Sequence, residues 1–220
     1  MSEVKLIKIK EEILSENRDL AGVVRSRLDT QKTAMCNIMA SPGGGKTSLI
    51  LRTIEAIAGG MNVAVIEADI DSTVDSEKVA QTGTQAVQIE TGGFCHVDAA
   101  MVERALESLD VDNLDLVFVE NVGNLVCTAE SDTGAHVNVV ILSVPEGDDK
   151  PLKYPNIFTV ADAVVVNKID YLELADFDLA AFRRHVAQLN THAPIFEVSC
   201  RTGEGISEWV SWLLPRIESR

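Results

Sequence analysis

The sequence is short of positive charge. Its 220 residues include 19 lysines and arginines against 34 aspartates and glutamates, so the formal net charge is −15. The phosphate backbone of a nucleic acid would repel such a chain, and we therefore expect no DNA or RNA partner. At this length we expect one domain with one hydrophobic core.

Long apolar runs are missing as well. Charged residues interrupt the first twenty residues, so we expect no signal peptide, and no later segment approaches the roughly 18 uninterrupted apolar residues of a membrane helix. Cysteine is scarce, and the four cysteines at positions 36, 95, 127 and 200 form no CxxC pair. We expect a cytoplasmic protein without a membrane partner, whose cysteines are thiols or metal ligands rather than disulfides.

Short apolar runs rich in Val and Ile alternate with amphipathic stretches. The runs are residues 34–40, 61–68, 85–90, 114–120, 137–144, 161–167 and 193–199, and helical spacing follows most of them, in 46–58, 75–83, 98–110, 177–190 and 205–217. This alternation predicts a doubly wound α/β domain over residues 31–220, with a mostly parallel sheet of about seven strands. Residues 1–30 are predicted to form an N-terminal extension, helical from about Glu11 to Leu28, that serves as a packing arm.

A glycine-rich segment, MASPGGGKTSLI, joins the first predicted strand to the first predicted helix. This is the setting of a P-loop, in which backbone N–H groups and a helix N-terminus hold a polyphosphate. Lys46 would neutralise the β and γ phosphates, and the Thr47 hydroxyl would bind Mg²⁺. The strict pattern has glycine where this chain has Ala40, so a small side chain must be tolerated there. The predicted nucleotide-binding residues are Gly43, Gly44, Gly45, Lys46, Thr47 and Ser48, and Lys46 is also a predicted catalytic residue.

A second motif, VVVNKID, ends another apolar run about 120 residues after the P-loop. A carboxylate at a strand end accepts hydrogen bonds from the ring N–H and the exocyclic amine of guanine, whereas adenine offers no such pair of donors. Asp170, with Asn167 and Lys168, therefore predicts GTP rather than ATP. In EVSCRTGEG, Ser199 and Cys200 sit where GTPases of this type carry a small Ser-Ala pair against the base. We interpret Cys200 as a packing substitute for alanine and not as a metal ligand.

Acidic residues follow further apolar runs. Asp69 and Asp75 lie in IEADIDSTVDSEKV, and Glu120 ends VFVE, so all three can reach the phosphate end of the site. Mg²⁺ prefers a few carboxylate or hydroxyl oxygens together with waters, so Thr47, Asp69 and Glu120 are the predicted magnesium ligands, with Glu90 a weaker candidate. Asp75 is predicted either to orient the attacking water, as a catalytic residue, or to cap the helix that begins at SEKVAQ. Both roles remain open.

The segment TGGFCHVDA places Cys95 beside His96. Alone, such a pair is more often incidental than a metal site, but ENVGNLVC brings Cys127 from the strand next to the nucleotide. Imidazole and thiolate suit zinc, nickel or copper, while the carboxylates suit magnesium. Three ligands do not close a tetrahedral site. We therefore expect two subunits, each with this ligand set, to complete the site by symmetry.

Six blocks of the sequence together resemble one family. They are NIMASPGGGKTSLI, TGGFCHVDAAMV, LDLVFVENVGNLVC, EGDDKPLKYP, VVVNKID and TGEGISEW. In this order, from about residue 5 to the C-terminus, they resemble the HypB family of hydrogenase nickel-incorporation GTPases. The resemblance implies a P-loop GTPase of the SIMIBI class that forms a GTP-dependent homodimer. It also implies delivery of Ni²⁺ to the large subunit of [NiFe]-hydrogenase, together with a HypA-type nickel chaperone.

The resemblance assigns roles to individual residues. The metal loop of the family maps onto Cys95, His96 and Cys127, and the residue that reaches the neighbouring subunit's nucleotide maps onto Lys153. Some members add a cysteine motif or a histidine-rich tract near the N-terminus, and since residues 1–30 have neither, we expect no extra nickel store. Four residues differ from those most usual in the family, and none of them removes a ligand or a charge: Ala40, Ala68, Thr128 and Cys200.

Two other functions fit parts of the pattern. The urease nickel GTPases carry a VETGG loop similar to QIETGG here, but usually separate Cys from His by a proline and lack ENVGNLVC. A metal-storage dimer with incidental GTP turnover is the second alternative. In such a dimer the nucleotide would leave metal affinity unchanged.

Overall fold

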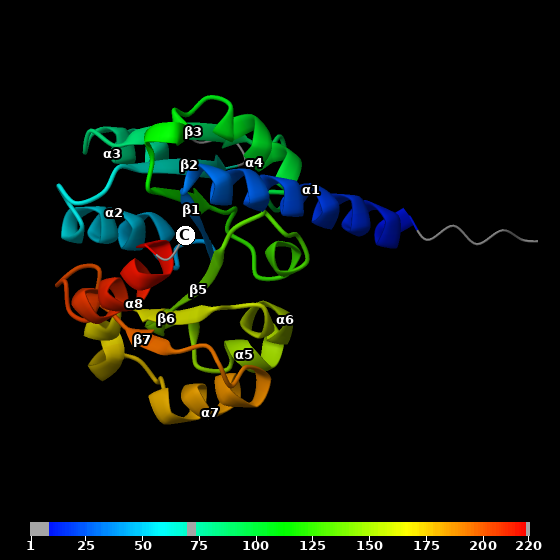
Figure 1. Cartoon of the computed structure of the whole chain (residues 1–220). Coiled ribbons are helices and arrows are strands. Elements are labelled where there is room, and N and C mark those ends of the chain that lie inside the picture. Colours follow the sequence, from blue (N-terminus) through cyan, green and yellow to red (C-terminus); the bar gives the residue numbers. More distant parts are fainter. Residues whose placement is uncertain (1–8, 70–73, 219–220) are drawn as a thin grey trace, which may run out of the picture.

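One parallel sheet organises the chain, of which the computed structural model describes residues 9–69 and 74–218. The strands run in the order β3-β2-β4-β1-β5-β6-β7, and all neighbours are parallel (Figure 1). Their bounds are Ala34–Ala40 (β1), Val63–Asp69 (β2), Gln85–Glu90 (β3), Leu116–Glu120 (β4), Val137–Ser143 (β5), Ala163–Asn167 (β6) and Ile195–Glu197 (β7). The doubly wound, parallel α/β fold predicted from the sequence is confirmed.

Helices cover both faces of the sheet (Figure 1). The α-helices are Ile9–Gln31 (α1), Lys46–Ala56 (α2), Val74–Ala80 (α3), Ala99–Leu106 (α4), Lys150–Lys153 (α5), Pro155–Thr159 (α6), Leu179–Leu189 (α7) and Ile206–Glu218 (α8), and the 3-10 turns are Val111–Asn113 (η1), Cys127–Ala129 (η2), Val144–Glu146 (η3) and Ile169–Leu174 (η4). Helices α2, α3 and α8 share one apolar core with the sheet, and α1, α4, α6 and α7 pack on the other face. The short helices α5 and α6 were not predicted, because one turn is too short to show a helical period.

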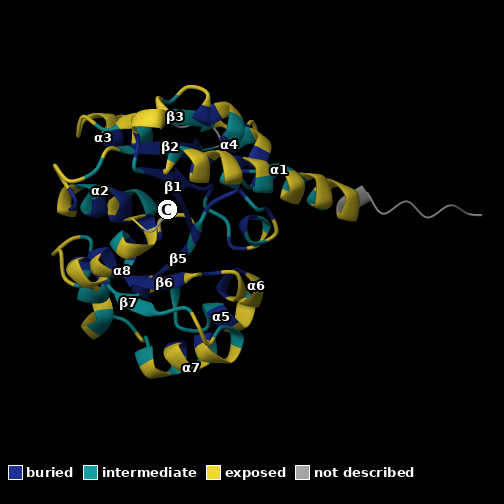
Figure 2. Cartoon of the chain, in the orientation of Figure 1, coloured by how far each residue is buried: buried dark blue, intermediate teal, exposed yellow. Residues whose placement is uncertain are grey.

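The five central strands are largely buried, the edge strands β3 and β7 are half-buried or exposed, and the helices expose their outer surfaces (Figure 2). Val and Ile predominate in the strands because β-branched side chains pack well on a pleated surface. Phe118 of β4 and Trp209 of α8 are fully buried in the core beneath α2 and α8. Each such side chain stabilises the fold by about 1.5–3 kcal/mol relative to an exposed one. None of the helices in the described ranges is long and apolar enough to cross a membrane.

Helix α1 is longer than the predicted Glu11–Leu28 segment, since it begins by Ile9 and ends at Gln31. It packs beside α4 and against the end of β1. Ala21, Val24 and Leu28, spaced three and four residues apart, form its buried stripe. From Asn17 to Gln31, α1 is thus in contact with the α/β domain.

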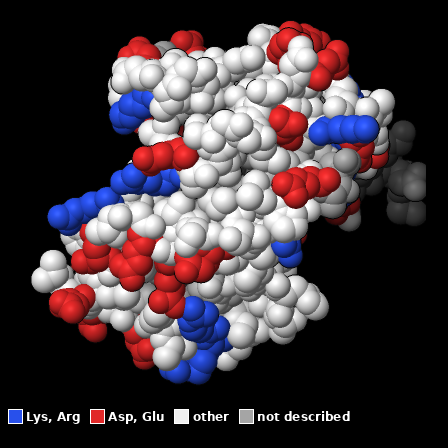
Figure 3. Space-filling model, turned by 60° about the vertical axis from the view of Figure 1, so that its left-hand side comes forward, with Lys and Arg blue, Asp and Glu red and all other residues white. Residues whose placement is uncertain are grey.

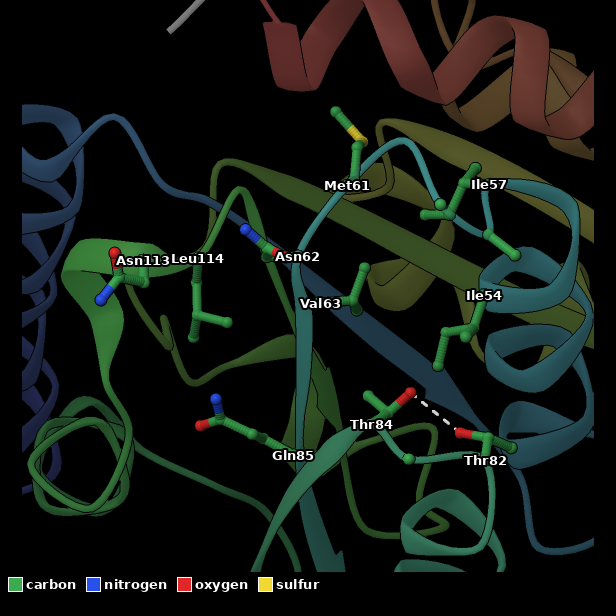
Figure 4. Close-up of a pocket in the computed structure, with 13 residues that line it drawn as sticks. Ile54, Ile57, Met61, Asn62, Val63, Thr82, Thr84, Gln85, Asn113 and Leu114 are labelled. Atoms are coloured by element: carbon green, nitrogen blue, oxygen red, sulfur yellow. Dashed lines mark hydrogen bonds between the residues drawn. The ribbon is translucent and has the colours of Figure 1, made fainter.

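The carboxyl and amino ends of the strands carry different groups of residues. The carboxyl ends of β1, β2, β4 and β6 gather the P-loop, the acidic residues and the NKID motif, as expected for a sheet of this topology. A cavity of about 420 Å³ lies at the opposite ends of the strands, among the amino ends of β2, β3 and β4. Figure 4 shows Asn62, Val63, Gln85 and Leu114 around it. This cavity is therefore separate from the nucleotide residues.

Candidate nucleotide and metal sites

The P-loop turns from β1 into α2 in a conformation that requires glycine. Gly43 and Gly45 have φ angles of 75° and 99°, in the left-handed region that side chains disfavour. At Gly45 a Cβ atom would also lie 2.2 Å from the Asn167 amide nitrogen. The absence of a side chain therefore lets the phosphate loop and the end of β6 approach each other closely.

The NKID motif contacts the P-loop directly. The Asn167 side-chain amide donates a hydrogen bond to the Gly44 carbonyl at 3.1 Å, and the Lys168 ammonium donates to the Gly43 carbonyl at 2.8 Å. Two motifs that are far apart in the sequence thus form one continuous wall. Their arrangement is the one expected of a nucleotide site that holds phosphate at one end and a base at the other.

A cavity of about 380 Å³ lies between the P-loop helix and the NKID motif. Its lining includes Ser48, Asp170 and Cys200. The Ser199 hydroxyl donates to the Asp170 carboxylate at 2.7 Å, and this hydrogen bond holds the pKa of Asp170 below its usual range. Asp170 is thus kept ionised, as an acceptor for guanine must be. Burial raises the pKa of the Cys200 thiol to about 11, which fits a packing role rather than a reactive one.

Glu120, at the end of β4, faces the start of α2. The Thr47 hydroxyl donates to its Oε1 atom at 2.8 Å, and the Lys46 ammonium lies 3.9 Å from the same atom. Glu120 is only 2% exposed, and burial raises its pKa to about 7, although Lys46 and Thr47 oppose the shift. The structure thus brings Thr47 and Glu120, two of the predicted magnesium ligands, into direct contact.

A buried carboxylate that was not among the predicted ligands stands beside Glu120. Glu67 of β2 is the register partner of Glu120 of β4, and acceptor atoms of Glu67, Asp75 and Glu120 lie within 4.8 Å of one another. Burial and the charge of Glu120 raise the pKa of Glu67 to about 7. One oxygen of each glutamate is buried without a hydrogen-bond partner. Such oxygens suit a hard cation, so the donor set fits Mg²⁺. The signal in the sequence was an acidic residue, Glu67, between apolar neighbours within the strand VAVIEAD.

The other predicted acidic residues are placed differently. Asp69 and Glu90 are register partners at the ends of β2 and β3, and neither belongs to the carboxylate group around Glu120. Asp75 is the second residue of α3, and its carboxylate pairs with Lys78 at 2.6 Å. The proposed N-cap role of Asp75 is therefore corrected, because a cap precedes the helix whereas Asp75 lies in its first turn.

Cys95, His96 and Cys127 come together as predicted. One ligand atom from each lies within 4.8 Å of the others, all three side chains are half-buried, and Cys95 Sγ is 3.8 Å from His96 Nδ1. Gly92 and Gly93, with φ angles of 60° and 102°, turn the chain after β3 so that the Cys–His pair faces η2. Thiolate and imidazole at this separation can bind a borderline metal ion such as Ni²⁺ or Zn²⁺.

A chain of buried amides connects the metal loop to the centre of the sheet. Asn121, the residue after Glu120, accepts a hydrogen bond from the Val97 N–H at 3.0 Å. Its own amide donates to Asn37 of β1 at 3.1 Å, and Asn37 donates to Asn138 of β5 at 3.0 Å. Adjacent residues of one strand end therefore contact the two sites, Glu120 at the P-loop and Asn121 at the metal loop.

The remaining predicted residue, Lys153, lies on the surface of α5. Its side chain is 59% exposed and forms an ion pair with Asp149, the residue that precedes the helix. Acidic side chains form several patches on the face shown in Figure 3, with Lys and Arg between them. The reach of Lys153 toward a second subunit stays a prediction.

Known proteins share this sequence and fold. A family model described as the CobW/HypB/UreG nucleotide-binding domain matches residues 34–197. The hydrogenase maturation factor HypB of Azotobacter vinelandii is 44% identical over 213 residues, which cover 97% of this chain and 70% of that protein. The crystal structure of HypB from Helicobacter pylori in complex with nickel has a TM-score of 0.88 at 34% identity, over 93% of this chain and 96% of that one.

A more distant neighbour shares the fold alone. The 54 kDa signal recognition particle protein of Aeropyrum pernix, in complex with GDP, has a TM-score of 0.57 at 16% identity, over 86% of this chain and 50% of that one. Fold and site together define a nucleotide-binding P-loop GTPase of the SIMIBI class. Within that class, the chain belongs to the HypB family of hydrogenase maturation factors.

Proposed function

We propose that this chain is a GTP-hydrolysing nickel metallochaperone that assists nickel insertion into [NiFe]-hydrogenase. The observation that carries the proposal is the pair of sites joined by one strand end, with Glu120 at the P-loop and the Asn121 amide at the metal loop. The nickel-bound relative supports nickel as the cargo. Cys95 directly beside His96, with Cys127 in ENVGNLVC, favours a hydrogenase over a urease client.

Each nucleotide residue has a defined task in this proposal. The P-loop amides and Lys46 bind the phosphates. Asp170 accepts hydrogen bonds from guanine, and the Ser199 hydroxyl holds the Asp170 carboxylate in place. Thr47, Glu120 and Glu67 would hold Mg²⁺, which would offset the charge of the phosphates. Asp69 and Glu90 remain alternative ligands. Asp75, which lies close to both glutamates, would orient a water for attack on the γ-phosphate.

Nickel is held by Cys95, His96 and Cys127, and we propose that two subunits combine their ligand sets in a GTP-dependent homodimer. Lys153 would then reach the partner's nucleotide. Hydrolysis would loosen the dimer and release the metal to the hydrogenase large subunit, with a HypA-type chaperone as partner in the cytoplasm. Movement at the γ-phosphate can reach the metal loop because Glu120 and Asn121 are consecutive residues.

The test is a Ni²⁺ titration with GDP and with a non-hydrolysable GTP analogue, while the mass in solution is followed. We expect tighter nickel binding and a larger dimer fraction with the analogue. Linkage then requires nickel to tighten binding of the analogue by the same factor. Equal nickel affinity with both nucleotides would favour the storage dimer instead. Unchanged nickel binding in Cys95→Ala, His96→Ala and Cys127→Ala would refute the site.

A further inference from the structure

One side chain of α1 contacts both segments that carry the metal ligands. The side-chain oxygen Oδ1 of Asn17 accepts a hydrogen bond from the Ala99 N–H at 2.9 Å. The side-chain nitrogen Nδ2 of Asn17 donates to the backbone carbonyl of Asp132 at 2.9 Å. Ala99 begins α4, three residues after His96, and Asp132 follows Cys127 by five residues. Asn17 therefore lies between the downstream ends of the two metal-bearing segments.

Both backbone groups that Asn17 contacts are held in place by further hydrogen bonds. The Asp98 side chain caps α4 by accepting a hydrogen bond from the Met101 N–H at 2.8 Å, which fixes the backbone at Ala99. Asp132 is held on its other side by Arg25, whose guanidinium contacts the two carboxylate oxygens at 2.9 and 3.1 Å. The loop cannot move away from α1 without breaking this charged pair.

The backbone of the second segment also fits closely against α1. Gly134 has a φ angle of 82°, and a Cβ atom there would lie 2.9 Å from both the Ala21 carbonyl and the Val24 side chain. The Arg25 guanidinium also donates to the Ala135 carbonyl at 3.2 Å. The segment after Cys127 thus packs directly against α1, whereas the Cys–His loop contacts the same helix through the hydrogen bond at Ala99.

We propose that Asn17 is a positioning residue for the metal site, which ties the Cys95–His96 loop to the Cys127 segment through a single amide. The inference rests on the proposed nickel site. Metal ligands that depend on two separate segments bind tightly only if those segments keep their spacing, as outer contacts do in other metal sites. Helix α1 then contributes to the metal site through this one side chain, and not merely by being docked on the domain.

The test compares Ni²⁺ affinity of the full chain with GDP bound, by competition with a chromogenic chelator, in wild type and three variants. Asn17→Ala should weaken nickel binding about tenfold, the lower end of the range for lost outer contacts, because Asn17 holds the backbone near the ligands and not a ligand itself. It should also shift the thiolate-to-nickel absorption band, which reports ligand geometry. Asn17→Asp keeps the acceptor for the Ala99 N–H and loses the donor, so its loss should be smaller.

Gln31→Ala is the matched control. It removes another side-chain bond of α1, to Asp112 at 2.6 Å, at a distance of about 21 Å along the helix from Asn17. Its nickel affinity and absorption band should equal those of the wild type, and all variants should bind GDP equally.

Two results would overturn the positioning role: wild-type affinity in Asn17→Ala, or an equal loss in Gln31→Ala, which would reflect general docking of α1. Failure of the proposed function looks different, since nickel binding would then survive Cys95→Ala, and the inference would fall with it.

Discussion

Glu120 and Glu67 should make the stability of the metal-free protein depend on pH in an unusual direction. The perturbation is the substitution Glu120→Gln, which keeps the size of the side chain and removes its charge. In the folded protein burial raises the pKa of each glutamate from 4.5 to about 7. Between these values the unfolded chain has released protons that the folded chain retains, so stability falls as the pH rises.

The size of the effect follows from the two pKa values. A carboxyl group whose pKa moves from 4.5 to about 7 contributes about 3 kcal/mol to this loss of stability. Removal of Glu120 abolishes its own contribution and lowers that of Glu67, because the charge of Glu120 is the second cause of the Glu67 shift after burial. Between pH 5 and pH 8, a window that leaves out the first half unit above pH 4.5, we therefore expect wild type to lose at least about 2.5 kcal/mol more than Glu120→Gln.

Urea unfolding of nucleotide-free protein in EDTA measures the difference, with fluorescence of Trp209 and Trp212 in α8 as the probe. The exposed Glu107, changed to Gln, controls for the loss of one negative charge from an acidic protein. Glu107→Gln should follow the wild-type pH dependence. Parallel pH curves for wild type and Glu120→Gln would refute the idea that these buried glutamates retain protons.

Four further substitutions test the nucleotide site. Asp170→Asn should shift preference from guanine to xanthine nucleotide, measured by competition binding, and equal turnover of ATP and GTP by the wild type would contradict the base assignment. Lys46→Ala should abolish tight GTP binding. Asp75→Ala should bind GTP normally and hydrolyse it slowly. A normal hydrolysis rate in Asp75→Ala would contradict a catalytic role and leave Asp75 only its ion pair with Lys78. Gly45→Ala should prevent GTP binding, since its Cβ would displace Asn167, and retained affinity in a calorimetric titration would show that the loop can adjust.

The amino-acid sequence determined the elements of this protein and the identity of its motifs. Apolar runs of five to seven residues, most of them rich in Val or Ile, specify strands locally, and the glycines of the P-loop specify a turn that only glycine can make. Because parallel strands all end at one edge of the sheet, the order of motifs also predicted that Thr47, Glu120 and Asp170 would share a site. These inferences need only short stretches of chain and a known topology.

Only the tertiary structure decided which residues stand beside these motifs. Glu67 meets Glu120 because β2 and β4 are neighbours in a particular register, and packing of the whole sheet sets that register. Asn121 reaches Val97, and Asn17 reaches Ala99 and Asp132, through contacts between segments that are remote in sequence. Local patterns carry no information on such pairings, because the free energy that fixes them comes from burial across the fold rather than from the residues themselves.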